Sequence, residues 1–328
     1  MPHSTSSAPA QPDVLRLGLG LAAVGRPAYI TPGRSADLGR GRAPEDLERH
    51  THGLLDAAVH AGIRYVDVAR SYGRAEEFVS TWLAARDLCD VEVGSKWGYR
   101  YVGGWRLDAD VHEVKDHSVA AFHEQWPQTD RLLGAHLGRY LVHSATLDTG
   151  ALTDPALHRE LARVRDRGIR VGISTSGPQQ ADAVRAALDV VVGGAPLFTA
   201  FQVTWNPLEP SVGPLAAEAA DRGAQVVVKE AVANGRLAPG TADDAPGVRH
   251  VVGLAQEAGV PVDQLCVAVA LAQPWVWRVL SGAATVEHLA SHVAGARLDL
   301  RQDVVAEALA ATEVPAAYWA ARSARAWT

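Results

Sequence analysis

Short apolar runs alternate with amphipathic stretches along the chain from residue 14 onward. Such runs are typical of buried strands, and apolar positions three or four residues apart are typical of helices that bury one face. The pattern predicts eight strand–helix repeats, with strands at 17–21, 65–68, 91–94, 140–143, 169–173, 201–203, 225–228 and 276–280. Strands that alternate with helices form right-handed units around a parallel sheet.

Several of the predicted helices have recognisable ends. A helix is predicted over 44–60, with a proline at its start, and Asp154 caps another that ends near Gly168. Pro178 and Pro214 are predicted to open two more, because proline suits the first turn of a helix and glycine the residue after the last turn.

Eight repeats fit a closed (β/α)8 barrel of the TIM type, and an open doubly wound sheet is the alternative. No linker or shift in composition divides the chain. We therefore predict a single α/β domain over 14–328, preceded by a flexible, disordered tail over 1–13 that is rich in Ser, Pro and Ala.

Composition narrows the class of protein. The 328 residues are 48% hydrophobic and 21% charged, and the formal net charge is −6, which argues against a nucleic-acid partner. No apolar run approaches the roughly 18 residues of a membrane span. Residues 1–10 lack the features of a signal peptide, and Cys89 and Cys266 cannot form a disulfide framework. We expect a cytoplasmic enzyme without a membrane partner.

Lysine is rare in this chain, since only Lys96, Lys115 and Lys229 occur among the 31 basic residues. A lysine ammonium is a compact charge with a readily shifted pKa, which arginine does not offer. Two of the three lysines belong to a set of polar residues at or just past the carboxyl ends of predicted strands, the end that carries the chemistry in a barrel. The set comprises Asp67, Lys96, His143, Ser174, Gln202 and Lys229.

The segment 62–73 is the richest in candidate chemistry, because Asp67 ends a strand and Tyr72 follows five residues later in a glycine-containing loop. Lys96 and His143 come at the next two strand ends. In this order the four residues resemble the catalytic tetrad of the aldo-keto reductases, which are (β/α)8 barrels that reduce carbonyl groups with a nicotinamide cofactor. The resemblance continues at 172–174, 201–203, 234–237, 281–283 and 286–289 and covers nearly the whole chain after residue 13.

Carbonyl reduction explains why these residue types are needed. Tyrosine, with an ordinary pKa of about 10, is a poor proton donor near neutrality. A neighbouring Lys96 ammonium is expected to lower the pKa of Tyr72, while Asp67 keeps Lys96 charged and oriented. His143 is expected to donate a hydrogen bond to the substrate oxygen.

Each of the four also has a structural interpretation. Asp67 could be a helix cap, Tyr72 a loop aromatic, Lys96 an incidental surface cation and His143 a core histidine. Together, in this order, they favour the catalytic interpretation.

The resemblance also implies a cofactor site. Ser174, Thr175 and Gln202 would bind the nicotinamide carboxamide, although the family usually has Asn where Thr175 stands. Further cofactor contacts are implied for Leu21, Asp67, Lys229, Ala231, Asn234, Gly235, Ser281, Gly282, Ala283, Thr285, His288 and His292.

Lys229 stands where the family usually has an aromatic residue that stacks on the nicotinamide. Either Trp205 or another aromatic takes that role, or Lys229 binds a phosphate or a substrate oxygen. The structural alternative is a surface ion pair with Glu230.

The nucleotide phosphates would bind at the helix start near 281–288, through free backbone N–H groups. Members that favour NADP usually carry Arg or Lys there, where this chain has His288 and His292. We predict NADPH/NADP as the cofactor, with NAD as the alternative.

Two other motifs are discounted. Gly18 and Gly20 resemble part of a dinucleotide fingerprint, but Ala23 stands at the third glycine position. His112 and His117 are five residues apart, whereas a helical zinc motif needs four. The segment 112–117 is predicted to be a solvated helix start, with the mouth of the substrate site as the alternative. No metal site is predicted.

The function predicted from these features is reduction of a small aldehyde, ketone or sugar carbonyl, or the reverse oxidation of an alcohol. Two alternatives remain open. One is a regulatory barrel that binds the cofactor without turnover, and the other is a non-redox lyase or isomerase that uses Lys229.

Overall fold

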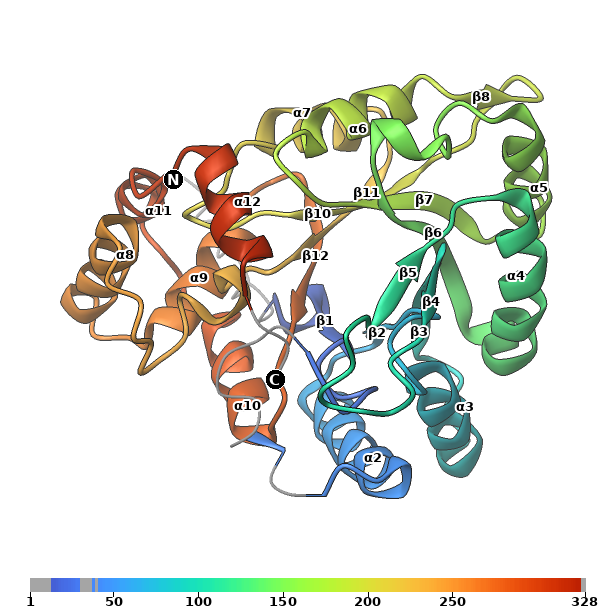
Figure 1. Cartoon of the computed structure of the whole chain (residues 1–328). Helices are drawn as coiled ribbons and strands as arrows, with labels where there is room; N and C mark the ends of the chain where they lie inside the picture. The colour runs from blue at the N-terminus through green and yellow to red at the C-terminus, as the bar shows by residue number, and fades with distance from the viewer. Residues whose placement is uncertain (1–12, 30–36, 39–40, 326–328) are drawn as a thin grey trace, which may run out of the picture.

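The computed structural model describes residues 13–29, 37–38 and 41–325. Within them, eight parallel strands close into a barrel in the order β1-β12-β11-β10-β7-β6-β3-β2 (Figure 1). The strands are β1 (Leu17–Gly20), β2 (Tyr65–Asp67), β3 (Glu92–Trp97), β6 (Leu137–Ala145), β7 (Arg170–Thr175), β10 (Ala200–Thr204), β11 (Gln225–Lys229) and β12 (Val276–Ser281). The (β/α)8 prediction is confirmed, and the open sheet is excluded.

Helices surround the barrel (Figure 1). They are α2 (Pro44–Ala61), α3 (Ala75–Arg86), α4 (Val119–Leu133), α5 (Pro155–Arg165), α6 (Gln180–Leu188), α7 (Gly213–Asp221), α8 (Pro246–Glu257), α9 (Val262–Leu271), α10 (Val286–Gly295), α11 (Gln302–Leu309) and α12 (Pro315–Ser323). Asp154 caps α5 as predicted by accepting a hydrogen bond from the N–H of Ala156. Pro178 does not open α6, because Gly177 has a φ of +91° and the chain becomes helical only at Gln180.

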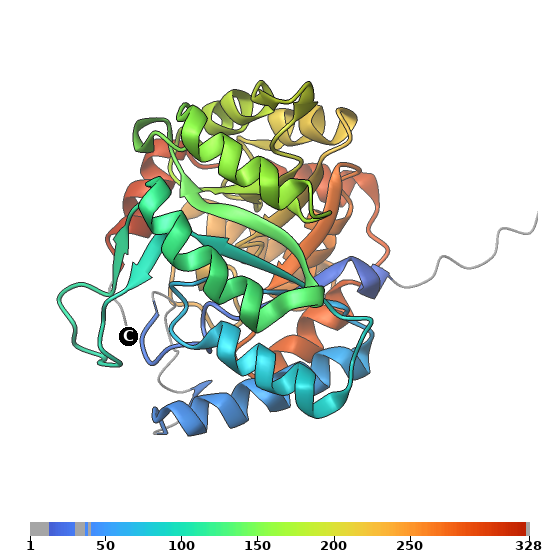
Figure 2. The same cartoon turned by 90° about the vertical axis from the view of Figure 1, so that its right-hand side faces the viewer.

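The two ends of the barrel differ. The 3-10 helix η1 (Asp13–Arg16) packs against β1 and β12 at one end, and the remainder of the predicted tail, 1–12, lies outside the described residues. An antiparallel hairpin of β4 (Tyr99–Tyr101) and β5 (Glu113–Lys115) lies at the other end together with α12 (Figure 2). A second small hairpin joins β8 (Val191–Val192) and β9 (Ala195–Pro196).

The hairpin corrects the prediction for 112–117. This segment is not a solvated helix start, since β5 pairs with β4, and both His112 and His117 are buried. The helix begins only at Val119, where Ser118 accepts a hydrogen bond from the N–H of Ala121. The pairing of β5 with β4 overrides the helical signal of the sequence.

Glycine allows the strands that carry the site to approach closely. A Cβ on Gly172 would lie 1.8 Å from the carbonyl oxygen of Ala200 on β10. The pairing that this glycine permits continues to Ser174 opposite Gln202. The helices are anchored by large buried side chains such as Trp82 and Phe78 on α3, each of which contributes about 1.5–3 kcal/mol by leaving water.

No single helix among the described residues is both long and apolar enough to cross a membrane; the one pair that passes by length and composition, α8 with α9, is bent by 94°.

Candidate active site

A buried ion pair lies at the carboxyl ends of β2 and β3. The Nζ of Lys96 is 2.5 Å from Oδ1 of Asp67 and also donates to the carbonyl oxygen of Val68 at 2.7 Å. The second carboxylate oxygen of Asp67 accepts a hydrogen bond of 2.7 Å from Nε2 of Gln202, on the far side of the barrel. Burial lowers the pKa of Lys96, and the charge of Asp67 opposes that effect. Both groups are therefore fixed in position before any ligand arrives.

Tyr72 lies in the loop after β2, which packs against the loop after β1. Gly73 has a φ of +61°, and a Cβ there would lie 2.5 Å from the carbonyl oxygen of Gly25. The guanidinium of Arg26, also in the loop after β1, donates to the carbonyl oxygen of Ser71 at 2.7 Å. These two contacts fix the loop that carries Tyr72 against the loop after β1. The Nζ of Lys96 lies 4.9 Å from the centre of the Tyr72 ring.

The predicted lowering of the pKa of Tyr72 is wrong. Burial, and then the charge of Asp67, raise the pKa of Tyr72 well above its ordinary value, although Arg26 acts to lower it. Lys96 is engaged by Asp67 and by a carbonyl oxygen, so its charge is largely compensated. Tyr72 is consequently a protonated phenol throughout the neutral range.

His143 completes the group. The register of β6 shifts between Val142 and Ala145, and the resulting bulge turns the side chain of His143 toward Tyr72. The two rings are 5.5 Å apart in an edge-on arrangement. Desolvation, followed by the charge of Lys96, lowers the pKa of His143 well below its ordinary value. The imidazole is therefore neutral and retains one N–H donor.

The pKa values of two other buried histidines predict how the free energy of unfolding depends on pH. Burial lowers the pKa of His117 and of His292 to about 4. In the unfolded chain both would titrate near 6.5, so below that pH the unfolded state binds more protons and the folded state loses stability. We expect the free energy of unfolding to fall by up to about 1.4 kcal/mol per pH unit for each histidine between pH 6.5 and 4.

Urea unfolding at pH 7, 6 and 5 measures this loss. His117→Asn and His292→Asn should each flatten the profile, while His60→Asn, at an exposed position on α2, should leave it unchanged. A profile in the wild type that is flat between pH 6.5 and 5 would contradict the prediction.

A cavity of about 650 Å³ extends from the buried ion pair to the start of α10. Most of the candidate residues line it. These are Asp67, Tyr72, Gln202, Lys229, Ala231, Asn234, Gly235, Ser281, Gly282, Ala283, His288 and His292.

Six candidates do not line this cavity: Leu21, Lys96, His143, Ser174, Thr175 and Thr285. Lys96 and His143 instead lie beside the Tyr72 ring, 4.9 and 5.5 Å from its centre. Ser174 accepts a hydrogen bond from the N–H of Ser144, and the hydroxyl of Thr175 donates to Gln180. Thr285 caps α10 through the N–H of His288. The hydroxyl of Ser174 thus keeps its O–H for a carboxamide oxygen, whereas the O–H of Thr175 is directed to Gln180 and its oxygen can only accept.

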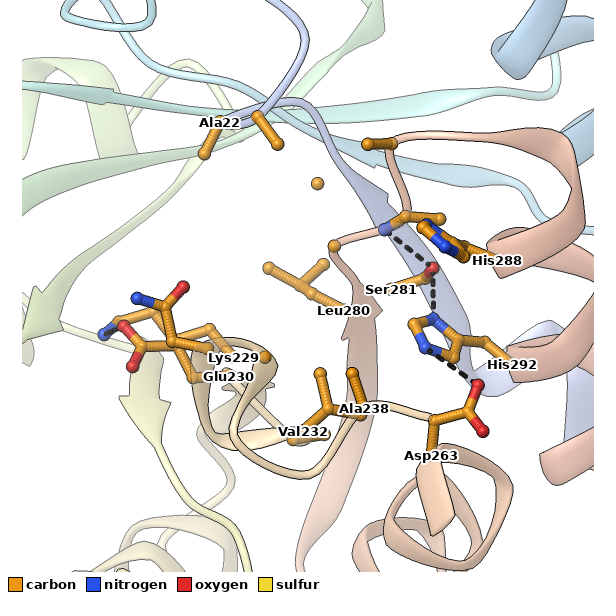
Figure 3. Close-up of a pocket in the computed structure, with 18 of the residues that line it drawn as sticks. Ala22, Lys229, Glu230, Val232, Ala238, Asp263, Leu280, Ser281, His288 and His292 are labelled. Carbon is orange, nitrogen blue, oxygen red and sulfur yellow. Dashed lines mark hydrogen bonds and ion pairs between the residues drawn. The ribbon is translucent and has the colours of Figure 1, made fainter. Parts of the chain in front are cut away.

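Lys229 and Glu230 form one wall of the cavity, opposite His288 and His292 (Figure 3). The Nζ of Lys229 contacts Oγ1 of Thr204 at 2.5 Å and Oε1 of Glu230 at 3.5 Å. The pair is half-buried and lines the cavity, which corrects the alternative of an ion pair on the outer surface. Trp205 packs edge-on against Trp275 and does not line the cavity, so it does not take the place of the usual aromatic.

The other wall carries a polar chain (Figure 3). Oγ of Ser281 is 2.7 Å from Nδ1 of His292, and Nε2 of His292 is 3.8 Å from Oδ2 of Asp263. The sequence reasoning missed Asp263, because an acidic residue in the first turn of a helix is unremarkable in sequence. Only the packing of α9 against α10 brings it to His292.

The cavity fits a nicotinamide dinucleotide. It is elongated, it begins at Tyr72 and Gln202, and it ends at the first turn of α10, where free N–H groups can bind phosphate. The Oδ1 of Asp263 is buried at this end without a hydrogen-bond partner among the described residues. A buried carboxylate oxygen requires a donor, and a dinucleotide offers amino and hydroxyl groups.

Comparisons with known proteins find a family whose model covers most of the chain. The model of the aldo/keto reductase family matches residues 16–313. No curated protein sequence matches the chain.

Solved structures show the same fold. The holo form of an aldo-keto reductase from Bacillus halodurans is 20% identical, with 91% of this chain and 92% of that chain covered and a TM-score of 0.68. Its apo form is 19% identical, with 84% of this chain and 89% of that chain covered and a TM-score of 0.60. A glycerol dehydrogenase from Gluconobacter oxydans is 21% identical, with 90% of this chain and 91% of that chain covered and a TM-score of 0.66.

Proposed function

Because the chain belongs to the aldo-keto reductase family and is thus an NAD(P)H-dependent oxidoreductase, we propose that it interconverts a small carbonyl compound and its alcohol at Tyr72. The observation that carries the proposal is the buried Lys96–Asp67 pair beside the Tyr72 ring, at the end of a cavity that fits the cofactor. The substrate class is an aldehyde, a ketone or a sugar.

The roles of the residues follow from their positions. When bound, the cofactor supplies the hydride for the carbonyl carbon. Tyr72, protonated because burial raises its pKa, donates its proton to the carbonyl oxygen. Lys96 and Arg26, with cationic groups 4.9 and 5.3 Å from the ring centre, stabilise the phenolate as it forms. Neutral His143 orients the substrate oxygen with its N–H.

The remaining residues of the cavity would hold the cofactor. Asp67 and Gln202 lie at the nicotinamide end, and the backbone of 281–284 lies at the phosphate end. With this activity we also propose a cytoplasmic location, where the reduced cofactors are made.

The proposed function is tested by cofactor absorbance. Purified protein is assayed with NADPH and with NADH against a panel of aldehydes, ketones and sugars, and in reverse with alcohols that include glycerol. Cofactor consumption equal to product formed supports the proposal. Cofactor binding without turnover on any member of the panel would favour the regulatory barrel, and turnover without any absorbance change would favour the lyase or isomerase.

The choice of nucleotide gives a further prediction. The residues that line the cavity at α10 are imidazoles and a carboxylate, and burial keeps His292 neutral with a pKa of about 4. We therefore propose NADPH as the cofactor with a preference over NADH of no more than about tenfold, because a neutral imidazole binds a 2′-phosphate less strongly than a guanidinium.

His288→Arg should increase the affinity for NADPH by about tenfold, from one charge-assisted hydrogen bond, and leave that for NADH unchanged. Calorimetric titration measures both affinities, with Arg297→Lys, past the end of α10 and outside the cavity, as the control. An equal gain in affinity for NADPH and NADH would show that the 2′-phosphate does not bind beside residue 288.

A further inference from the structure

The reaction end of the cavity holds one ammonium group whose charge is not fully compensated. Lys229 ends β11 and lines the cavity together with Asp67, Tyr72 and Gln202. The same cavity lining therefore joins this ammonium group to the candidate proton donor.

The acidic neighbour of Lys229 is already paired. Glu230 accepts hydrogen bonds from Nε of Arg322 through both carboxylate oxygens, at 2.9 and 3.1 Å. Burial acts to raise the pKa of Glu230, but Arg322 and Lys229 outweigh it and hold that pKa at about 2. Arg322 lies on α12, and its hydrogen bonds fix the side chain of Glu230, whose backbone φ is +58°. The three side chains together carry two positive charges and one negative charge, a net charge of +1.

The other groups around this end are neutral or paired. Asp67 compensates Lys96, and Arg26 is paired with Glu113 at 2.7 Å. Tyr72 is protonated, and His143 is neutral. Within the described residues, Lys229 is therefore the cation of its cluster with Glu230 and Arg322 that faces the cavity, while Arg325, which also lines the cavity, donates to the carbonyl oxygen of Asn234.

A fixed positive charge distinguishes the two oxidation states of the cofactor. The oxidised nicotinamide ring is cationic, the reduced ring is neutral, and the phosphates are the same in both. We propose that Lys229 makes this protein bind the reduced nicotinamide cofactor more tightly than the oxidised one. This inference rests on the proposed function, because it requires the nicotinamide to lie at the Tyr72 end of the cavity.

The expected discrimination is about tenfold, since Glu230 offsets part of a repulsion between two unit charges a few ångströms apart. A tenfold ratio corresponds to about 30 mV for a two-electron couple. Tighter binding of the reduced form makes the bound cofactor a stronger oxidant. Within the complex, the equilibrium shifts about tenfold from alcohol and oxidised cofactor toward carbonyl, reduced cofactor and a proton.

The test is a set of dissociation constants. NADH, NAD⁺, NADPH and NADP⁺ are titrated into the full-length wild type, Lys229→Met and Lys229→Arg by calorimetry. ADP-ribose, which lacks the nicotinamide, serves as the probe for the remainder of the site. We expect a reduced-over-oxidised preference of about tenfold in the wild type and in Lys229→Arg, and a ratio near one in Lys229→Met, with the affinity for ADP-ribose unchanged.

A pH series on the wild type tests the same inference without any substitution. Burial, opposed by Glu230, lowers the pKa of Lys229 to about 8, so the preference should decline above that pH. Glu230 and Arg322 keep their charges over this range, and Lys96 stays paired with Asp67. The decline should be absent in Lys229→Met, which separates Lys229 from Lys96.

The opposing outcomes are distinct. Equal weakening of both oxidation states and of ADP-ribose in Lys229→Met would show that Lys229 binds the pyrophosphate, and it would overturn the inference alone. A wild-type ratio of one at every pH would do the same. Failure of all four nucleotides to bind the wild type would overturn the proposed function and the inference together.

Discussion

Tyr72→Phe should lower kcat/KM for carbonyl reduction by about 10² to 10⁴-fold, the range typical of a lost general acid. The phenylalanine ring keeps the packing against His143 and the contact with Lys96, so the change removes only the hydroxyl. Cofactor dissociation constants should therefore stay within about twofold. Steady-state assays and calorimetry on the same preparations measure the two quantities.

A matched control is available on the β4–β5 hairpin. Tyr101→Phe removes a hydroxyl that accepts a hydrogen bond from the N–H of Trp105, on a residue that does not line the cavity. Its kcat/KM should change by less than about threefold. Activity in Tyr72→Phe equal to that of this control would show that another group supplies the proton.

The sequence predicted the parts of the site that are fixed by strand ends. Asp67, Lys96 and Gln202 come from three different strands, yet each lies where a strand meets the mouth of the barrel. In a barrel, that position alone brings them together, and the hydrogen bonds from Lys96 and Gln202 to Asp67 show that it does. The periodicity of the chain was sufficient for this step.

The parts that the sequence did not predict depend on packing between distant segments. Arg26 supports the loop that carries Tyr72 from the loop after β1, and Asp263 reaches the cavity only because α9 packs beside α10. Neither residue stands in a recognisable motif. The hydroxyl of Thr175 donates to Gln180, and a local hydrogen bond of this kind leaves no trace in residue spacing.

The direction of the pKa of Tyr72 was predicted wrongly for a related reason. The expectation counted the ammonium of Lys96 but neither the burial of the phenol nor the compensation of that ammonium by Asp67. A charge pair has a weaker field than a single charge, so desolvation dominates. The same reasoning applies to Lys229. Its neighbour Glu230 also pairs with Arg322, so Glu230 compensates less of the charge of Lys229, and the ammonium acts more strongly on a bound ligand than the Lys229–Glu230 sequence suggests.

Lys96→Met should lower the free energy of unfolding by about 3–5 kcal/mol, because it leaves the buried carboxylate of Asp67 without its cation. Among the residues that the structure describes, the hydrogen bond from Gln202 would then be the one left to compensate that charge. The same variant should lose most of its activity, since Tyr72 would have no neighbouring ammonium to stabilise its phenolate. Urea unfolding at pH 7 gives the first quantity and the cofactor assay the second.

The double variant Asp67→Asn/Lys96→Met separates charge from packing. It removes both charges while an asparagine oxygen can still accept from Gln202, so most of the lost stability should return. Activity should not return, because the ammonium is still missing. If the double variant is as unstable as Lys96→Met, the loss comes from packing around the lysine stem and not from the unpaired carboxylate. If it regains activity, the ion pair holds the strands together but takes no part in the proton transfer at Tyr72.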